Sequence, residues 1–111
     1  MEIVFQHHDA PISDNMRRRA EQALRKVARR ASRVVDGVIR FQQHGATRRV
    51  ELTMHAGSGR RYVASAESRY FGSALSDAAR KLAMQVDHSK RTPKARARAR
   101  KVSRGRPSRT P

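Results

Sequence analysis

The residues best suited to do chemistry in this 111-residue chain are arginines and lysines at helical spacing. The segment from Arg17 to Arg33 holds eight basic residues and a single acidic residue, Glu21. Basic side chains four positions apart on a helix repel one another, and a bound polyanion removes that cost. The guanidinium group also suits paired hydrogen bonds to phosphate. The segment therefore indicates a surface that binds a phosphate backbone rather than an ordinary solvated face.

The composition of the whole chain favours the same kind of partner. It has 26 Lys and Arg against 9 Asp and Glu, which gives a formal net charge of +17. Such a charge indicates a polyanion, with nucleic acid as the first candidate and an anionic membrane surface as the second. No signal peptide is visible from Met1 to His8, and no apolar run is long enough to span a membrane. We expect a cytoplasmic protein that does not bind a membrane.

Catalytic and metal sites have little support in the sequence. The chain has no cysteine, which excludes disulfides, thiolate nucleophiles and cysteine-based metal centres. There is no nucleophile elbow and no glycine loop that would cradle a phosphate. His7, His8 and Asp9 could suggest a metal site, but no spacing rule supplies a further ligand. The sequence predicts a protein that is not an enzyme and needs neither metal nor cofactor.

Two helices are expected to position the basic side chains. In the first, over residues 12–32, Ser13 suits the N-cap, and apolar residues such as Leu24 recur at helical spacing. Arg18, Arg25, Arg29 and Arg33 should lie opposite this apolar stripe, with Arg19, Lys26 and Arg30 beside it. The second helix is expected over residues 70–90 and should end before Pro93, and in it Asp77 can support Arg80 and Lys81.

Four segments have the alternation typical of strands. They are residues 2–7, 38–43, 48–56 and 60–67, with a turn predicted at Asp36-Gly37 and a tight hairpin at Gly57 to Gly59. Two amphipathic helices on one face of a four-stranded sheet would bury all of the apolar stripes. The sequence therefore predicts an α+β domain of β-α-β-β-β-α order, a two-layer sandwich like that of double-stranded RNA-binding domains.

The end of the chain has a different composition. From Lys90 onward there are ten basic residues and no acidic residue, and such a segment cannot bury a core. We expect a folded domain over 1–91 and a disordered polybasic tail over 92–111. Within the tail, Arg104, Gly105, Arg106 and Pro107 form the core of an AT-hook, which would contact a DNA minor groove. The alternative is an electrostatic arm that raises affinity for any nucleic acid.

The order of the elements and several short motifs resemble a known family. Residues 52–56 (Leu-Thr-Met-His-Ala), the glycine turn and residues 64–67 (Ala-Ser-Ala-Glu) stand where the ribosome hibernation-promoting factors have a strand, a turn and a similar segment. This family includes the ribosome-associated inhibitor called protein Y, and its members were once named sigma-54 modulation proteins. The resemblance covers residues 1 to about 91, with departures at Ser76, Met84 and His88 on the second helix.

The resemblance implies a ribosome-associated translation inhibitor. Such a protein binds 16S rRNA of the small subunit in the mRNA and tRNA channel of 70S ribosomes, silences them under stress, and is expected to be a monomer off the ribosome. The alternatives are a DNA-binding, nucleoid-associated protein that uses the tail and a regulatory partner of another protein. The residues expected to bind RNA are Arg18, Arg19, Arg25, Lys26, Arg29, Arg30, Arg33, Arg80, Lys81, Lys90 and Arg91.

Overall fold

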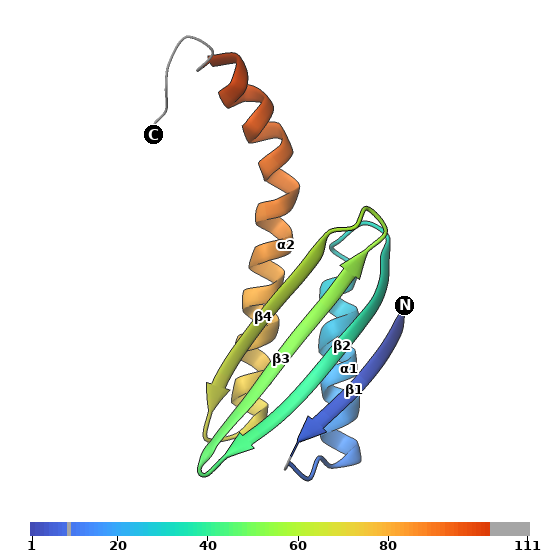
Figure 1. Ribbon diagram of the computed structural model, residues 1–111, viewed down its shortest axis with the longest axis vertical. Coiled ribbons are helices and arrows are strands. Elements are labelled where there is room, and N and C mark those ends of the chain that lie inside the picture. The colour runs from blue at the N-terminus through green and yellow to red at the C-terminus, as the bar shows by residue number, and fades with distance from the viewer. Residues whose placement is uncertain (9, 103–111) are drawn as a thin grey trace.

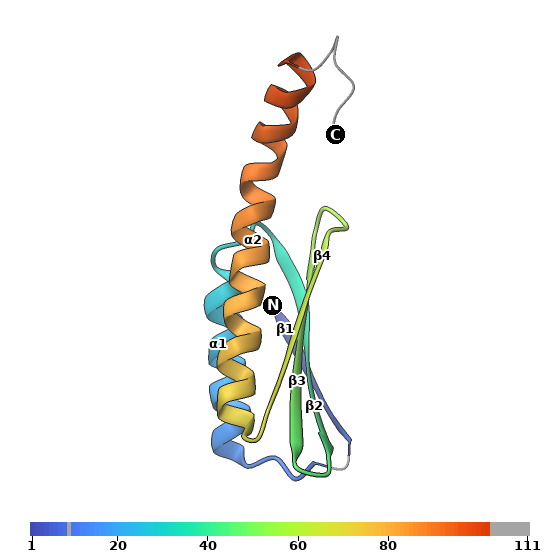
Figure 2. The same ribbon diagram turned by 90° about the vertical axis from the view of Figure 1, so that its left-hand side faces the viewer.

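The computed structural model describes residues 1–8 and 10–102 and has one layer of strands and one of helices (Figure 2). The predicted α+β class and element order are confirmed. The sheet has the strand order β1-β2-β3-β4, with β1 parallel to β2 and the other pairs antiparallel. Both helices cover the same face of this sheet (Figure 1). The elements are β1 (Glu2–His8), α1 (Asp14–Ala28), β2 (Val34–His44), β3 (Thr47–Ala56), β4 (Arg61–Ser68) and α2 (Phe71–Val102).

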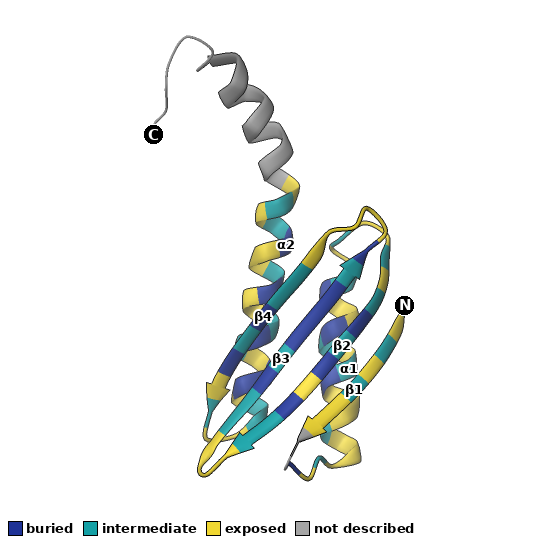
Figure 3. Cartoon of the chain, in the orientation of Figure 1, coloured by how far each residue is buried: buried dark blue, intermediate teal, exposed yellow. Residues whose placement is uncertain are grey.

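The core lies between the sheet and the two helices. Alternate residues of β2 and β3 point to the helix side, where Ile39, Phe41 and Leu52 are fully buried. From the helices, Leu24 of α1 and Leu82 of α2 are buried against them. Figure 3 shows this burial as dark segments along the central strands and the inner faces of the helices. The apolar stripes of the sequence therefore meet in one core, as the alternation and helical spacing predicted.

Helix α1 begins as predicted and ends earlier than predicted. The Ser13 side chain accepts a hydrogen bond of 3.1 Å from the Met16 N–H, which satisfies a free donor of the first turn. The last helical residue is Ala28, so the prediction that the helix continues to residue 32 is wrong. Arg33 has a φ of 55°, and its carbonyl accepts a 2.7 Å hydrogen bond from the Gly57 N–H. This contact fixes the chain reversal into β2, and a continued helix could not make it.

The turn predicted at Asp36-Gly37 is also wrong, because both residues lie inside β2. Gly37 is buried, and a Cβ atom there would lie 2.7 Å from Leu24 Cδ2 and 3.2 Å from the Thr53 carbonyl oxygen. The glycine therefore provides space for Leu24 of α1 to pack directly on the strand. In this chain the glycine indicates a close approach of helix and sheet rather than a turn. The hairpin predicted at Gly57 to Gly59 is confirmed, with Gly59 at a φ of 87°.

Helix α2 is longer than the sequence predicted. It packs Ala78, Leu82 and Val86 on the sheet and then continues past the end of the sheet to Val102 (Figure 1). The prediction that it ends before Pro93 is wrong, although a proline inside a helix removes one backbone hydrogen bond. Residues 94–101 are alanine, arginine and lysine, which are among the strongest helix formers, and they favour continuation. The division into a domain over 1–91 and a tail over 92–111 stays a prediction.

The free edge of β4 is covered by side chains of α2. The Gln85 amide accepts a 3.0 Å hydrogen bond from the Val63 N–H and donates one of 2.6 Å to the Val63 carbonyl. Lys81 Nζ donates to the Ser65 carbonyl at 3.1 Å. These contacts occupy backbone groups that could otherwise pair with another strand. Within the described residues, no helix is long and apolar enough to cross a membrane.

Candidate nucleic-acid interface

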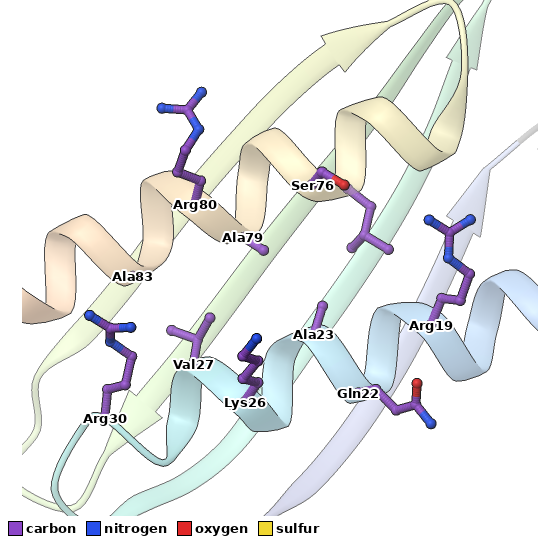
Figure 4. A pocket seen from close by; sticks show the side chains of 11 residues that line it. Arg19, Gln22, Ala23, Lys26, Val27, Arg30, Ser76, Ala79, Arg80 and Ala83 are labelled. Carbon is purple, nitrogen blue, oxygen red and sulfur yellow. The ribbon is translucent and has the colours of Figure 1, made fainter.

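A groove of about 520 Å³ runs between α1 and α2 on the side of the helices away from the sheet (Figure 4). Its floor is apolar and comes from both helices, with Ala23 and Val27 of α1 facing Ala79 of α2. Its rims carry basic and neutral polar side chains, and no acidic residue lines it. The predicted RNA-binding residues that the structure brings together here are Arg19, Lys26, Arg30 and Arg80.

The two ends of the groove are held differently. At one end, Arg30 forms a paired ion contact with Asp87 of α2, with Arg30 Nε 3.2 Å from Asp87 Oδ1. At the other end, the Arg19 guanidinium lies over Gly72 in the first turn of α2, about 3.5 Å from where a Cβ atom would stand. Arg80 is 3.5 Å from Asp77 and turns away from α1 (Figure 4). The charged side chains of the groove to which the described residues give no ion pair are therefore Arg19 and Lys26.

A second hollow, of about 380 Å³, lies where α1 ends beside the start of β1. It brings together three more of the predicted residues, Arg25, Arg29 and Arg33. Arg25 forms an ion pair of 2.9 Å with Glu21 and donates a 3.4 Å hydrogen bond to the Met1 carbonyl. Because α1 ends at Ala28, Arg29 is the C-cap of the helix and Arg33 lies on the turn that follows. The two hollows thus separate the residues expected beside the apolar stripe, which line the groove, from Arg25, Arg29 and Arg33, which were expected opposite it.

The remaining predicted residues lie apart from these two clusters. Arg18 is exposed on α1 and lines neither hollow. Lys81 binds the backbone of β4, so its ammonium group serves the sheet edge. Lys90 lines a small hollow of about 210 Å³ near the β3–β4 turn. The Arg91 side chain and residues 104–107, which include the AT-hook-like motif, lie outside the described residues.

Sequence reasoning missed polar residues beside the basic ones. Gln22 and Ser76 line the groove between the helices, but neutral side chains carry no charge signal in the sequence. Arg60 was also missed. It lines the same small hollow as Lys90 and donates a hydrogen bond to Ser89 of α2. The Arg-Arg pair after the hairpin glycines was the available signal, because that turn had to lie at the end of the sheet.

On the sheet face away from the helices, one set of polar contacts joins Arg40, Arg49 and Glu51. Arg40 Nε donates to Gln6 Oε1 at 3.1 Å, and its Nη1 lies 3.6 Å from Glu51. Arg49 lies 3.5 Å from the same carboxylate and donates to the Ser65 hydroxyl at 3.2 Å. These contacts link all four strands. In contrast, the structure gives no ion pair to Arg18, Arg19, Lys26 or Arg29 in the described part of the helix layer.

Comparisons with known proteins agree with the fold. A model of the family described as sigma 54 modulation protein / S30EA ribosomal protein matches residues 3–94. A solved structure of a ribosomal subunit interface protein from Coxiella burnetii is similar at a TM-score of 0.71 and 20% identity, over 81% of this chain and 98% of that chain. The N-terminal domain of Protein Y from Thermus thermophilus is similar at 0.70 and 20%, over 79% and 98%. No sequence among the curated proteins matches the chain.

Proposed function

The chain belongs to the sigma 54 modulation protein / S30EA ribosomal protein family, whose members are ribosome-associated, and from this premise we propose that it silences ribosomes by binding the small subunit. The proposed partner is 16S rRNA in the channel for mRNA and tRNA. Association with ribosomes implies the cytoplasm. The family is not a class of enzymes, and inhibition needs only that the protein occupies the channel.

The observation that carries the proposal is the set of basic side chains on the helix layer that lack an acidic partner. Arg18, Arg19, Lys26 and Arg29 are exposed, and no described carboxylate pairs with them. A phosphate backbone carries condensed cations, and each of these side chains that neutralises a phosphate releases such cations into solution, which drives binding. The arginines can also make paired hydrogen bonds to a phosphate group. The helix layer is therefore the proposed rRNA-binding surface.

The predicted residues that already have partners contribute differently. Arg25 is held by Glu21 of the same helix and Arg30 by Asp87 of α2, so both would add less to phosphate binding, and the Arg30 contact would also orient the two helices. Lys81 supports the edge of β4. Lys90 and Arg91 are proposed to add further positive charge for RNA binding. The tail is proposed to add electrostatic affinity for RNA, with DNA binding through Arg104 and Arg106 as the second candidate.

Sedimentation through a sucrose gradient tests the proposal with the full chain. Wild-type protein should migrate with isolated small subunits and with 70S ribosomes, but not with isolated large subunits. Arg29→Glu should reduce the bound fraction severalfold, because it places a negative charge among phosphates. Arg61→Glu, the same change on the sheet face, should leave binding close to the wild-type level. Equal loss in the two variants would exclude the helix layer as the binding surface.

A second measurement separates the two candidate roles of the tail. Arg104→Gln/Arg106→Gln should lower affinity for ribosomes and for A·T-rich DNA alike if the tail is an electrostatic arm. A selective loss of binding to A·T-rich DNA, with ribosome binding unchanged, would favour the DNA-binding alternative. The measurement is a titration of labelled DNA beside the gradient experiment, at the same salt concentration, because both affinities depend on salt.

A further inference from the structure

The groove between α1 and α2 has a composition that a surface for phosphate alone does not need. Phosphate contacts require cationic groups, but this groove also has an apolar floor. Ala23 of α1 and Ala79 of α2 form part of this floor. Both alanines are partly exposed, although they lie between buried residues of the core. The groove volume of about 520 Å³ falls within the usual range for small-molecule sites. An apolar, concave floor of this size can accept a flat heterocyclic ring.

The rims supply what the rest of a nucleotide requires. Arg19 and Lys26 stand on the α1 rim two helical turns apart, about 10 Å along the helix axis, and have no described ion pair. Their long side chains can reach phosphates on either side of a ring resting between them. Gln22 and Ser76 line the same groove and offer neutral donors and acceptors to the edge of a base. No acidic side chain lines the groove itself, and the carboxylates beside it, Asp77 and Asp87, are paired with Arg80 and Arg30.

We propose that this groove binds one unpaired nucleotide of an RNA strand, with its base on the alanine floor and its flanking phosphates on Arg19 and Lys26. A paired base cannot reach the floor, because it is stacked inside a helix whose grooves display only its edges. The inference rests on the proposed function and adds the form of RNA that is bound. The protein would select a bulged or single-stranded nucleotide, and the other basic cluster would hold the adjoining backbone.

Fluorescence of 2-aminopurine tests the inference with the full-length protein. The probe is a short single-stranded RNA with one central 2-aminopurine, and the comparison ligands are the same strand in a duplex and the free nucleotide monophosphate. Ala79→Leu and, independently, Ala23→Leu fill the floor from each helix while keeping helix propensity nearly constant. Ala46→Leu, the same change at an exposed turn between β2 and β3, is the matched control.

Wild-type protein and the Ala46→Leu control should change the fluorescence of the single strand and leave the duplex signal unchanged. Each floor variant should bind the single strand about tenfold more weakly, which is the effect of losing one base contact. Unchanged binding by both floor variants, with native circular dichroism, would overturn the inference. Equal affinity for the free nucleotide and the strand would overturn the assignment to RNA. Failure of wild-type protein to sediment with ribosomes would refute the proposed function, whatever the fluorescence shows.

Discussion

Removal of two unpaired arginines from the helix layer should change the salt dependence of RNA binding by a predictable amount. Arg18 and Arg29 are both exposed and have no described ion pair, and they lie outside the groove between the helices. The variant Arg18→Gln/Arg29→Gln removes two charges without adding new ones. If each arginine neutralises one phosphate, the slope of log affinity against log salt should become less steep by about 1.4 to 1.8.

The slope translates into a measurable difference in affinity. Between 50 and 200 mM salt, that change in slope corresponds to a factor of about ten. Wild-type protein should therefore lose about tenfold more affinity than the double variant over this range. The assay is a fluorescence-anisotropy titration of purified small subunits, which carry the proposed site, with labelled protein at four or more KCl concentrations.

Two control variants define the result that would refute this reasoning. Arg61→Gln removes a charge from the sheet face and should not change the slope. Arg25→Gln removes an arginine that is already paired with Glu21, so it should change the slope less than a single unpaired arginine does. A double variant with the wild-type slope, or an Arg61→Gln variant with an equal change, would show that counterion release does not occur at the helix layer.

Three further predictions concern the packing that holds this surface. Gly37→Ala should lower the free energy of unfolding by about 1–3 kcal/mol in urea titrations, because its Cβ would lie 2.7 Å from Leu24 Cδ2. In a protein that already carries Leu24→Ala, the same Gly37→Ala change should cost much less. Gln85→Ala should accelerate hydrogen exchange of the Val63 amide, because it removes the side-chain oxygen that accepts from this amide. Gln85→Glu keeps an acceptor oxygen and should preserve the protection. Equal exchange rates in the wild type and both variants would contradict the conclusion that Gln85 covers the edge of β4. Asp87→Asn removes the carboxylate that holds the Arg30 guanidinium, so it should lower the free energy of unfolding by about 1 kcal/mol or less and raise the affinity for RNA. An unchanged affinity for RNA would place Arg30 outside the interface.

The parts of the fold that follow from local pattern could be predicted from the sequence. The alternation in β3 and the stripe around Leu24 gave the strand, the helix and the shared core, because each depends on a period within one segment. Gly37 could not be interpreted locally, since its role depends on Leu24, which approaches from another element. The same holds for the last turn of α1, where a contact between Arg33 and Gly57 from the β3–β4 turn determines the end of the helix.

The candidate site was predictable as a list of charges but not as an arrangement. The basic residues were visible in the sequence, and the resemblance to a family indicated their partner. Helical spacing placed Arg25 and Arg29 in one row, and both line one hollow, but spacing could not show that Met1 would lie beside them. Spacing could not show that Asp87, 57 residues away, would pair with Arg30. Which charges remain unpaired is a property of tertiary contacts, and for that reason it required the structure.

The distribution of paired and unpaired charges gives the protein a preferred orientation toward a polyanion. On the sheet face, Glu51 lies between Arg40 and Arg49 and offsets part of their positive charge. Arg18, Arg19, Lys26 and Arg29, which have no described ion pair, lie on the helix layer. Two packed layers are about 10 Å apart, which is roughly one Debye length at 0.1 M salt. At physiological salt the carboxylates of the sheet are therefore largely screened from a phosphate that approaches the helices. Under the proposed function, an RNA backbone would approach α1 and α2 first, with the groove between these helices facing the RNA.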